Sequence, residues 1–229
     1  MFTCPICHSE LTELDSEQQA TCTFCGAIEE TGYICPNGHY QCEDCRMATQ
    51  TEIIERVSLN TKITDPIAIA NLIMKHPSFN PYGVEHHELV AAACLAAMRN
   101  LNIKNINDIK LTAAIKRGNK IPYGACGSMG TCGACVSAGI AIGILTNSNY
   151  LKDQERNLTI RTTANALLKL TELGGPRCCK FSTYSSILAV WETATNELNM
   201  NLPPLSVMCD FQGILKECHL EKCPYYEKR

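Results

Sequence analysis

Two cysteine pairs near the start of the chain have the spacing of zinc knuckles. The motifs are Cys4-x2-Cys7 and Cys22-x2-Cys25. Each motif places two thiols on one tight turn, so that both can reach the same ion, and Gly26 after the second pair suits such a turn. Two pairs supply the four ligands of a tetrahedral site and predict bound zinc. The alternative is four free or disulfide-bonded cysteines.

A second set of ligand-type residues follows within eleven positions: Cys35, His39, Cys42 and Cys45. Thiolate and imidazole groups both suit zinc, so this set predicts a second site, with a solvent-exposed His39 as the alternative. The eight residues can be grouped in two ways. A sequential grouping makes a zinc ribbon of the first four cysteines and a Cys3His site of the second set. A cross-braced grouping gives the sets Cys22, Cys25, Cys42, Cys45 and Cys4, Cys7, Cys35, His39.

In either grouping the protein fills all four positions around each ion, which is typical of a structural metal site. The order of ligands from Cys22 to Cys45 also resembles the first six ligands of a RING finger. The final Cys-x2-Cys of a RING finger is missing downstream, and Cys4 and Cys7 would have to replace it. That departure disfavours a ubiquitin ligase.

A glycine-rich loop carries the motif Cys126-x5-Cys132-x2-Cys135 into the start of a predicted helix, with Thr131 as its expected cap. The helix dipole would lower the pKa of Cys132, and loop N–H groups could hydrogen-bond sulfide. The glycines of the loop and helix start, Gly127, Gly130 and Gly133, would leave room for an inorganic cluster. The alternative is close helix packing, with the cysteines as small apolar residues.

Further thiols follow in two places. Cys178 and Cys179 lie between Arg177 and Lys180, whose charges would stabilise thiolates. We expect one of the two adjacent cysteines to be a ligand and the other a redox partner, and the alternative is a helix-capping turn with buried thiols. The C-terminal segment could fold back and complete one or two [4Fe–4S] sites. The predicted cofactor ligands are Cys126, Cys132, Cys135, Cys178, Cys179, Cys209, Cys218 and Cys223.

Two histidines, His86 and His87, begin the most strongly predicted helix, 85–100. His87 would share a helical face with Cys94 and could reach a site in the core, with Glu88 nearby. The alternative is that both histidines are capping or surface residues. Cys94 itself is expected to be a small core residue.

Several blocks of the chain resemble known families. Gly130 to Ala134, followed by Gly139 to Gly143, resembles the central signature of the C-GCAxxG-C-C family, whose members are presumed to be redox-active or cluster-binding. A larger set of blocks comprises Cys35–Tyr40, Glu85–His87, Ala125–Gly133, Gly174–Cys179 and Cys218–Pro224. Together these blocks resemble an uncharacterised cysteine-rich domain family of anaerobic archaea and bacteria, some of whose members are joined to radical SAM enzymes. The resemblance implies metal chemistry in an anaerobe.

The elements that must position these residues divide the chain in two. Residues 1–47 hold seven cysteines and few large apolar side chains, so this domain is expected to fold on metal. Residues 48–229 are expected to form an all-α domain that carries the iron–sulfur site. The predicted helices span 52–59, 67–75, 85–100, 107–115, 131–145, 158–173 and 182–198. The predicted fold class is mainly α, a helical bundle preceded by a small zinc-ribbon-like Cys/His module.

Composition and charge limit the setting. The net charge of −3 produces no broad field that would attract nucleic acid or a membrane. The longest apolar run, Val136 to Leu145, is too short to span a bilayer, and no signal peptide is expected at the N-terminus. A cytoplasmic location, where thiols stay reduced, is therefore expected.

Three functions fit these patterns. The favoured one is an accessory protein of anaerobic metabolism, with structural zinc and an iron–sulfur cluster, that moves electrons or sulfur for a redox or radical partner enzyme. The second is an enzyme whose cluster or thiol pair acts on a small substrate near His86, His87 and Arg177. The third is a zinc-only adaptor or nucleic-acid-associated scaffold, whose candidate basic cluster, 116–120, is short. No nucleotide fingerprint or catalytic triad specifies a reaction.

Overall fold

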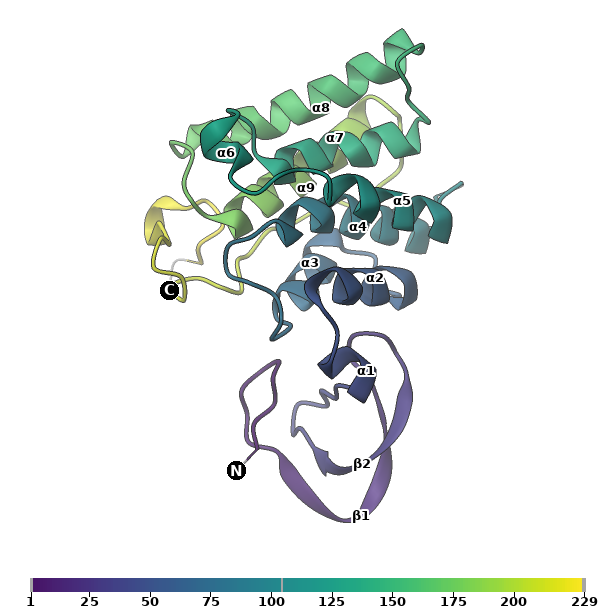
Figure 1. Cartoon of the computed structure of the whole chain (residues 1–229), viewed down its shortest axis with the longest axis vertical. Helices are drawn as coiled ribbons and strands as arrows, with labels where there is room; N and C mark the ends of the chain where they lie inside the picture. The colour runs from purple at the N-terminus through teal and green to yellow at the C-terminus, as the bar shows by residue number, and fades with distance from the viewer. Residues whose placement is uncertain (1, 104, 228–229) are drawn as a thin grey trace.

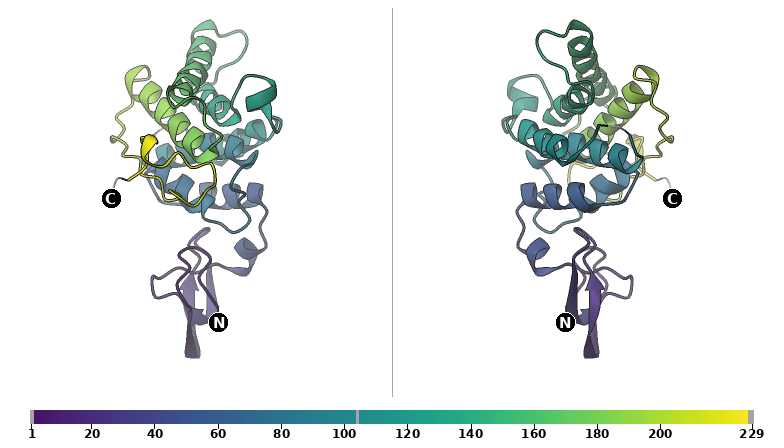
Figure 2. Two further views of the ribbon diagram at one scale, coloured as in Figure 1. Left: turned by 90° about the vertical axis from the view of Figure 1, so that its left-hand side faces the viewer. Right: turned by 90° about the vertical axis from the view of Figure 1, so that its right-hand side faces the viewer.

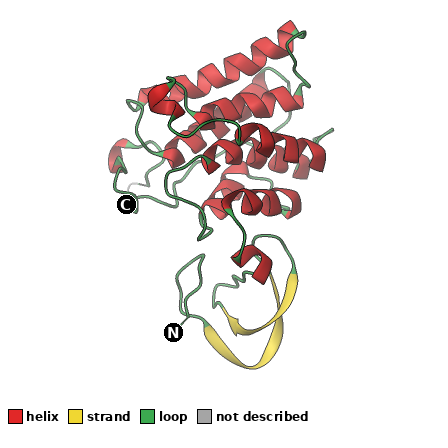
Figure 3. Ribbon diagram, viewed as in Figure 1, coloured by secondary structure: helices red, strands yellow, loops and turns green. Residues whose placement is uncertain are grey.

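The computed structural model describes residues 2–103 and 105–227, and these residues are mainly α-helical (Figure 1 and Figure 3). The elements are β1 (Thr12–Thr21), β2 (Ile28–Ile34), α1 (Glu43–Arg46), α2 (Gln50–Asn60), α3 (Pro66–Met74), α4 (Glu85–Asn100), α5 (Asp108–Gly118), α6 (Ala125–Ser128), α7 (Gly133–Leu145), α8 (Asp153–Glu172), α9 (Cys179–Asn196) and a 3-10 helix (Leu220–Lys222). A small Cys/His module precedes a helical bundle, which confirms the predicted fold class. Figure 2 shows the module as a narrow extension below the helical body.

The N-terminal module, residues 2–47, has almost no apolar core of its own. Its two strands form an antiparallel hairpin whose register runs from Thr12↔Ile34 to Thr21↔Ile28, and most of their side chains are exposed. The buried apolar and thiol side chains of the module are Cys4, Ile6, Cys22, Phe24, Cys35, Cys42 and Cys45. Sulfur therefore makes up much of the interior, and burial of apolar surface alone would stabilise the module little.

The helical body is built around α4. Every side chain from Leu89 to Met98 is fully buried, and α4 contacts α2, α3, α5, α7 and α9. Alanine dominates this helix because it favours helix formation and lets neighbouring helices approach closely. In the described part of the chain, no helix is both long and apolar enough to cross a membrane.

Small residues on α7 allow close packing on two sides. A Cβ atom at Gly139 would lie 2.2 Å from Thr163 Oγ1 on α8. A Cβ atom at Gly133 would lie 2.3 Å from the His87 ring on α4. Of the three glycines for which close packing was the alternative, Gly133 is closely packed, whereas a Cβ atom at Gly127 or Gly130 would have no atom within 4 Å.

Several helices begin directly after a residue whose side chain caps the first turn. Thr49 and Glu52 form a reciprocal capping box on α2, and Asn107 caps α5 as predicted. The predicted cap of α7 was wrong. Cys132, not Thr131, is the N-cap, because the backbone is still extended there, with φ −90° and ψ 128°.

The C-terminal segment, residues 203–227, folds back over the start of α9, where it is drawn in yellow in Figure 1 and Figure 2. The Tyr225 ring packs 5.3 Å from the Phe181 ring and 5.7 Å from the Tyr184 ring, measured between centroids. The carbonyl oxygen of Tyr225 also accepts a 2.9 Å hydrogen bond from the N–H of Cys209. These contacts bring cysteines of the segment to the first turn of α9.

One buried histidine joins the module to the helical body. His76 follows α3, and its Nε2 lies 2.8 Å from the carbonyl oxygen of Cys45 and 2.7 Å from Gln41 Nε2. Its ring also contacts the Phe24 ring edge-on, with 4.9 Å between centroids. The turn that carries Cys45 is therefore attached to the helical body through the His76 side chain.

Candidate metal centres

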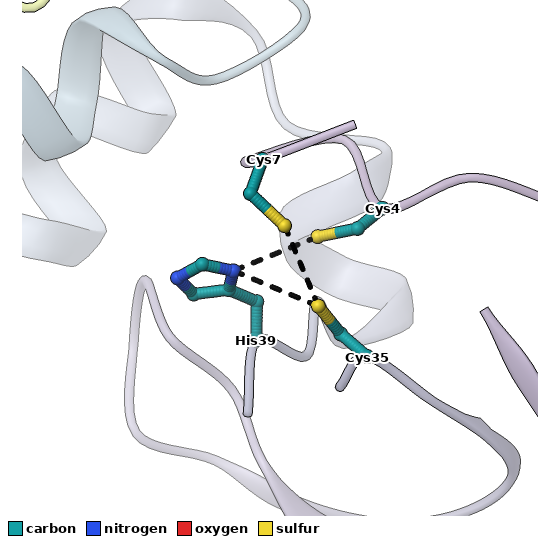
Figure 4. A group of neighbouring side chains, drawn as sticks. All are labelled: Cys4, Cys7, Cys35 and His39. Carbon is teal, nitrogen blue, oxygen red and sulfur yellow. Dashed lines mark hydrogen bonds between the residues drawn. The ribbon is translucent and has the colours of Figure 1, made fainter. Parts of the chain in front are cut away.

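The first candidate centre combines the start of the module with the loop after β2. The Sγ atoms of Cys7 and Cys35 are 3.5 Å apart, and His39 Nδ1 lies 3.8 Å from the sulfurs of both Cys4 and Cys35. Figure 4 shows the four side chains pointing toward a common centre. All four ligand atoms lie within 4.8 Å of one another, which is the spacing of a single-ion site.

The second candidate centre contains Cys22, Cys25, Cys42 and Cys45, whose sulfurs also lie within 4.8 Å of one another. The Sγ atoms of Cys25 and Cys42 are 3.6 Å apart. The structure therefore has the cross-braced grouping, in which each centre takes two residues from before β2 and two from after it. Because the ligand pairs interleave, the first centre joins the two outer ends of the hairpin, and the second joins its turn to the segment at α1.

The thiols of both centres are arranged as thiolates around a cation would be. Backbone N–H groups lie 3.4 Å from the Sγ atoms of Cys35 and Cys42. Hydrogen bonds from Ser9 and Asn37 lower the pKa of Cys7 to about 5, whereas burial raises the pKa of Cys42 to about 11. Several neighbouring thiols cannot all ionise without a positive charge between them, and a metal ion would supply it. The residues present therefore fit a metal at each centre.

A third gathering of sulfur lies where the C-terminal segment meets α9. Four thiols line one pocket, here called the tail pocket: Cys178, Cys209, Cys218 and Cys223. The rest of the lining is largely aromatic and includes Phe181, Tyr184, Phe211 and Tyr225. The pocket thus brings together four of the eight predicted cofactor ligands.

The sulfurs of the tail pocket face backbone N–H groups. The N···Sγ distances are 3.5 Å from Phe181 to Cys178, 3.4 Å from Phe211 to Cys209 and 3.4 Å from Gly213 to Cys218. Burial raises the pKa of Cys223, and hydrogen bonds from the backbone of Tyr225 and Tyr226 act against that effect. The same N–H···S pattern occurs at the two N-terminal centres, and it stabilises negative charge on sulfur.

The tail pocket differs from the N-terminal centres in the spacing of its thiols. Among the described residues, no three of its four sulfurs lie within 4.8 Å of one another, whereas both N-terminal sets meet that limit with all four ligands. A single ion needs close ligands, and a cluster of several metal ions needs ligands farther apart. The tail pocket therefore lacks the close ligand spacing of the two N-terminal centres.

Lys180 is the positive charge of the tail pocket. Its side chain lines the pocket and is 3% exposed, and burial lowers its pKa to about 8, against the effect of Cys179 and Cys178. Its Nζ donates to the carbonyl oxygen of Pro81 and lies 3.0 Å from His86 Nε2. Arg177, the other predicted cation, pairs instead with Glu217, at 3.2 Å.

Three other thiols lie together at the start of α7 and α9. A hydrogen bond with Cys135 lowers the pKa of Cys132 to about 5, and the same contact raises the pKa of Cys135. Cys179 is close enough for the Cys132 thiolate to raise its pKa further, in addition to burial. Cys126 is exposed on α6, and a Cβ atom at the neighbouring Gly127 would have no atom within 4 Å.

The histidine pair is divided between two environments. His86 is buried, and burial together with the charge of Lys180 holds its pKa well below the usual range. His87 packs its ring against Gly133 and places Nδ1 3.3 Å from the carbonyl oxygen of Ile121. The buried Glu88 accepts hydrogen bonds from Thr51 and Asn119 rather than from either histidine.

Comparison with known proteins identifies the helical body. A family described as a family of unknown function, DUF5714, matches residues 54–226. The chain belongs to DUF5714. The DUF5714 region begins within α2 and includes all nine cysteines after the module, whereas the eight module ligands and the block Cys35–Tyr40 lie before it. No curated protein and no solved structure matches the chain.

Sequence reasoning missed two kinds of supporting residue within this DUF5714 region. His76 is one of them, since a histidine directly before Pro77 offers a polar group at the end of α3. Ser182 and Ser186 lie four and eight residues after Cys178 on α9, so helical spacing could have pointed to them. Ser186 Oγ donates to Cys135 Sγ at 3.6 Å.

Proposed function

We propose that this DUF5714 protein is a metal-binding accessory protein of anaerobic metabolism. Its N-terminal module carries two structural zinc ions, and its helical body carries a [4Fe–4S] cluster in the tail pocket. The cluster serves electron or sulfur transfer to a redox or radical partner enzyme. The module and the body are two domains, residues 1–47 and 48–229, and the module is a docking element for the partner.

Zinc is the metal proposed for the module because of the ligand chemistry. Each centre has four protein ligands, Cys3His or Cys4, within the 4.8 Å spacing of a single ion. Thiolate and imidazole ligands in a closed tetrahedral set are typical of structural zinc. A closed set leaves no position for water or substrate, so the module is not the reactive part of the protein.

The observation that carries the cluster proposal is the tail pocket itself. Four cysteines from the start of α9 and the C-terminal segment line one pocket, and three of their sulfurs receive backbone hydrogen bonds. Four thiolate ligands are the usual set for a [4Fe–4S] cluster, and the sequence Cys223-Pro224 is of the kind that ends ferredoxin ligand runs. A bound cluster would supply one-electron transfer.

The chain supplies the surroundings such a cluster needs. Lys180 brings one buried positive charge to an anionic group, and its contacts with Pro81 and His86 hold it there. The aromatic side chains of Phe181, Phe211 and Tyr225 line the pocket and shield the partly buried thiols from some of the solvent. Charge, hydrogen bonds to sulfur and solvent exposure are the main factors that set a cluster's potential.

The test is the metal content of protein purified without oxygen. We expect about two zinc ions per chain, one for each N-terminal centre, and about four iron and four sulfide ions from one [4Fe–4S] cluster. The ultraviolet–visible spectrum should show the broad sulfide-to-iron absorption of a brown protein. A colourless protein with a third zinc ion and no iron would reject the cluster and leave the zinc-only scaffold.

Matched cysteine variants locate the cluster. Cys218→Ser removes one proposed ligand and should lower the iron and sulfide content by more than half. Cys94→Ser alters a fully buried thiol of α4 and should leave both contents unchanged. Equal iron in the two variants would show that the tail pocket does not hold the cluster.

A further inference from the structure

The start of α7 presents two thiols in unequal surroundings. Cys132 is the N-cap of α7 and is partly exposed, and Cys135 follows one helical turn later on the same side and is fully buried. Each thiol shifts the pKa of the other, because the two lie close together at the start of the helix. The Cys132 thiol can thus contact a molecule from solution, whereas the buried Cys135 thiol can contact Cys132 and not that molecule.

The pair is separate from the metal centres. In the described chain, neither Cys132 nor Cys135 belongs to a group of three or more ligand-type residues whose ligand atoms lie within 4.8 Å of one another, and neither lines the tail pocket. The polar neighbours of the pair include two hydroxyls of α9, from Ser182 and Ser186. Nothing in this setting requires a metal to satisfy the sulfurs.

The charge state of the two thiols suits thiol–disulfide exchange. The N-terminus of the thirteen-residue helix α7 favours negative charge on its cap residue. The pKa of Cys132 is lowered, first by the hydrogen bond with Cys135 and further by Ser182, while the pKa of Cys135 is raised. Near neutral pH the exposed thiol is therefore a thiolate and the buried thiol keeps its proton, which is the division of roles in Cys-x-x-Cys redox motifs.

We propose that Cys132 and Cys135 form a reversible dithiol–disulfide pair that reduces an organic disulfide, with Cys132 as the attacking thiol and Cys135 as the resolving thiol. This role is independent of the cluster and adds a two-electron site to the protein. The loop before Cys132 exposes the apolar side chains of Tyr123 and Met129, which would contact the part of a substrate next to its disulfide.

The exchange balances without another reactant. The Cys132 thiolate attacks one sulfur of the substrate disulfide, that S–S bond breaks, and the first leaving thiolate takes a proton from water. Cys135 then releases its proton to water and attacks Cys132 Sγ, which frees the second substrate thiolate to be protonated. Two electrons pass from the pair to the substrate, and a Cys132–Cys135 disulfide remains.

The experiment uses the full-length, metal-loaded, reduced protein and two disulfides of different size. Oxidised glutathione tests a small substrate, and insulin tests a protein substrate, both without oxygen and with mass mapping of the cysteines. We expect the wild-type protein to form the Cys132–Cys135 disulfide and release two thiols per disulfide consumed with at least one of the probes. Failure with both probes would overturn the proposal.

Variants separate the two roles. Cys135→Ser should stop at a mixed disulfide on Cys132, Cys132→Ser should form neither product, and Cys126→Ser should behave like the wild-type protein. Unchanged zinc and iron contents in all three variants exclude misfolding as the cause. If Cys135→Ser accumulates no mixed disulfide, or if Cys132→Ser reacts as fast as the wild-type protein, the assigned roles are wrong.

A pH profile tests the charge state separately. The rate of Cys132 alkylation by iodoacetamide should change less than about threefold between pH 6 and pH 8, because the thiolate is already formed. A thiol of an unstructured peptide should gain nearly a hundredfold over the same range, since its pKa is about 8.5. A Cys132 profile that follows the peptide would contradict the thiolate assignment.

Discussion

Replacing His76 by alanine should detach the N-terminal module from the helical body while both remain folded locally. His76 is 2% exposed and contacts Cys45, Gln41 and Phe24 of the module. Loss of a net hydrogen bond costs about 1 kcal/mol, loss of the edge-on aromatic contact about 0.5–1.5 kcal/mol, and the cavity adds to both. The expected loss of stability is therefore about 2–4 kcal/mol.

Two measurements show whether this loss falls on the junction. Urea unfolding followed by circular dichroism gives the change in stability, and limited proteolysis reports the exposure of residues 47–50 between the module and α2. We expect faster cleavage at the junction in His76→Ala, with zinc content unchanged, and a smaller effect in His76→Gln, which keeps a polar group at the site. Unchanged cleavage and an unchanged urea midpoint would refute the idea that this histidine attaches the module.

Three further predictions follow from the same structure. Cys25→Ser should unfold residues 1–47 and release zinc while far-UV helicity stays largely intact, and a collapse of helicity would show that the two parts are not separate domains. Because burial lowers the pKa of His86, the unfolded chain binds a proton before the folded protein does as the pH falls below about 6.5. The free energy of unfolding should therefore fall by up to about 1.4 kcal/mol per pH unit in that range. Urea titrations at several pH values should show that His86→Asn lacks this part of the pH dependence. Gly139→Val should destabilise the protein by about 1–3 kcal/mol in thermal unfolding, because its side chain would overlap Thr163 across the contact between α7 and α8, and an unchanged midpoint would contradict that packing.

The sequence predicted the helical body well where local signals were strong. The helix at 85–100 matches α4 because alanine content and apolar periodicity agree over its whole length. The helix predicted at 158–173 begins earlier, at Asp153, because the first turn of α8 is polar and exposed and has no apolar periodicity. Local patterns thus fix the existence of a helix better than its ends.

For the metal centres, the spacing of cysteines in the sequence predicted which residues are ligands but not which ligands share a centre. The Cys-x2-Cys motifs fix which two thiols share a turn, and both groupings of the module satisfied that rule. The cross-braced choice depends on how the hairpin of β1 and β2 brings distant turns together, which local spacing does not encode. In the same way, the approach of Cys209, Cys218 and Cys223 to Cys178 depends on the path of a segment that has little regular structure.

The adjacent Cys178 and Cys179 explain how one helix start can serve two kinds of chemistry. Cys178 is the N-cap of α9 and Cys179 its first residue, and successive helical residues point about 100° apart. Cys178 lines the tail pocket and Cys179 does not, and the pKa of Cys179 responds to Cys132 as well as to Lys180 and Cys178. The two adjacent side chains therefore differ in their contact with the tail pocket.

This division makes a direct prediction for the two single variants. Cys178→Ser should lose most of its iron and sulfide, because it removes a proposed ligand of the cluster, and its disulfide exchange at Cys132 should persist. Cys179→Ser should keep its iron and sulfide, because its thiol does not line the tail pocket. Metal analysis of the two proteins, purified side by side without oxygen, decides the matter. If Cys179→Ser loses iron as completely as Cys178→Ser, both thiols serve the cluster, and the separation of one-electron and two-electron sites at the start of α9 is wrong.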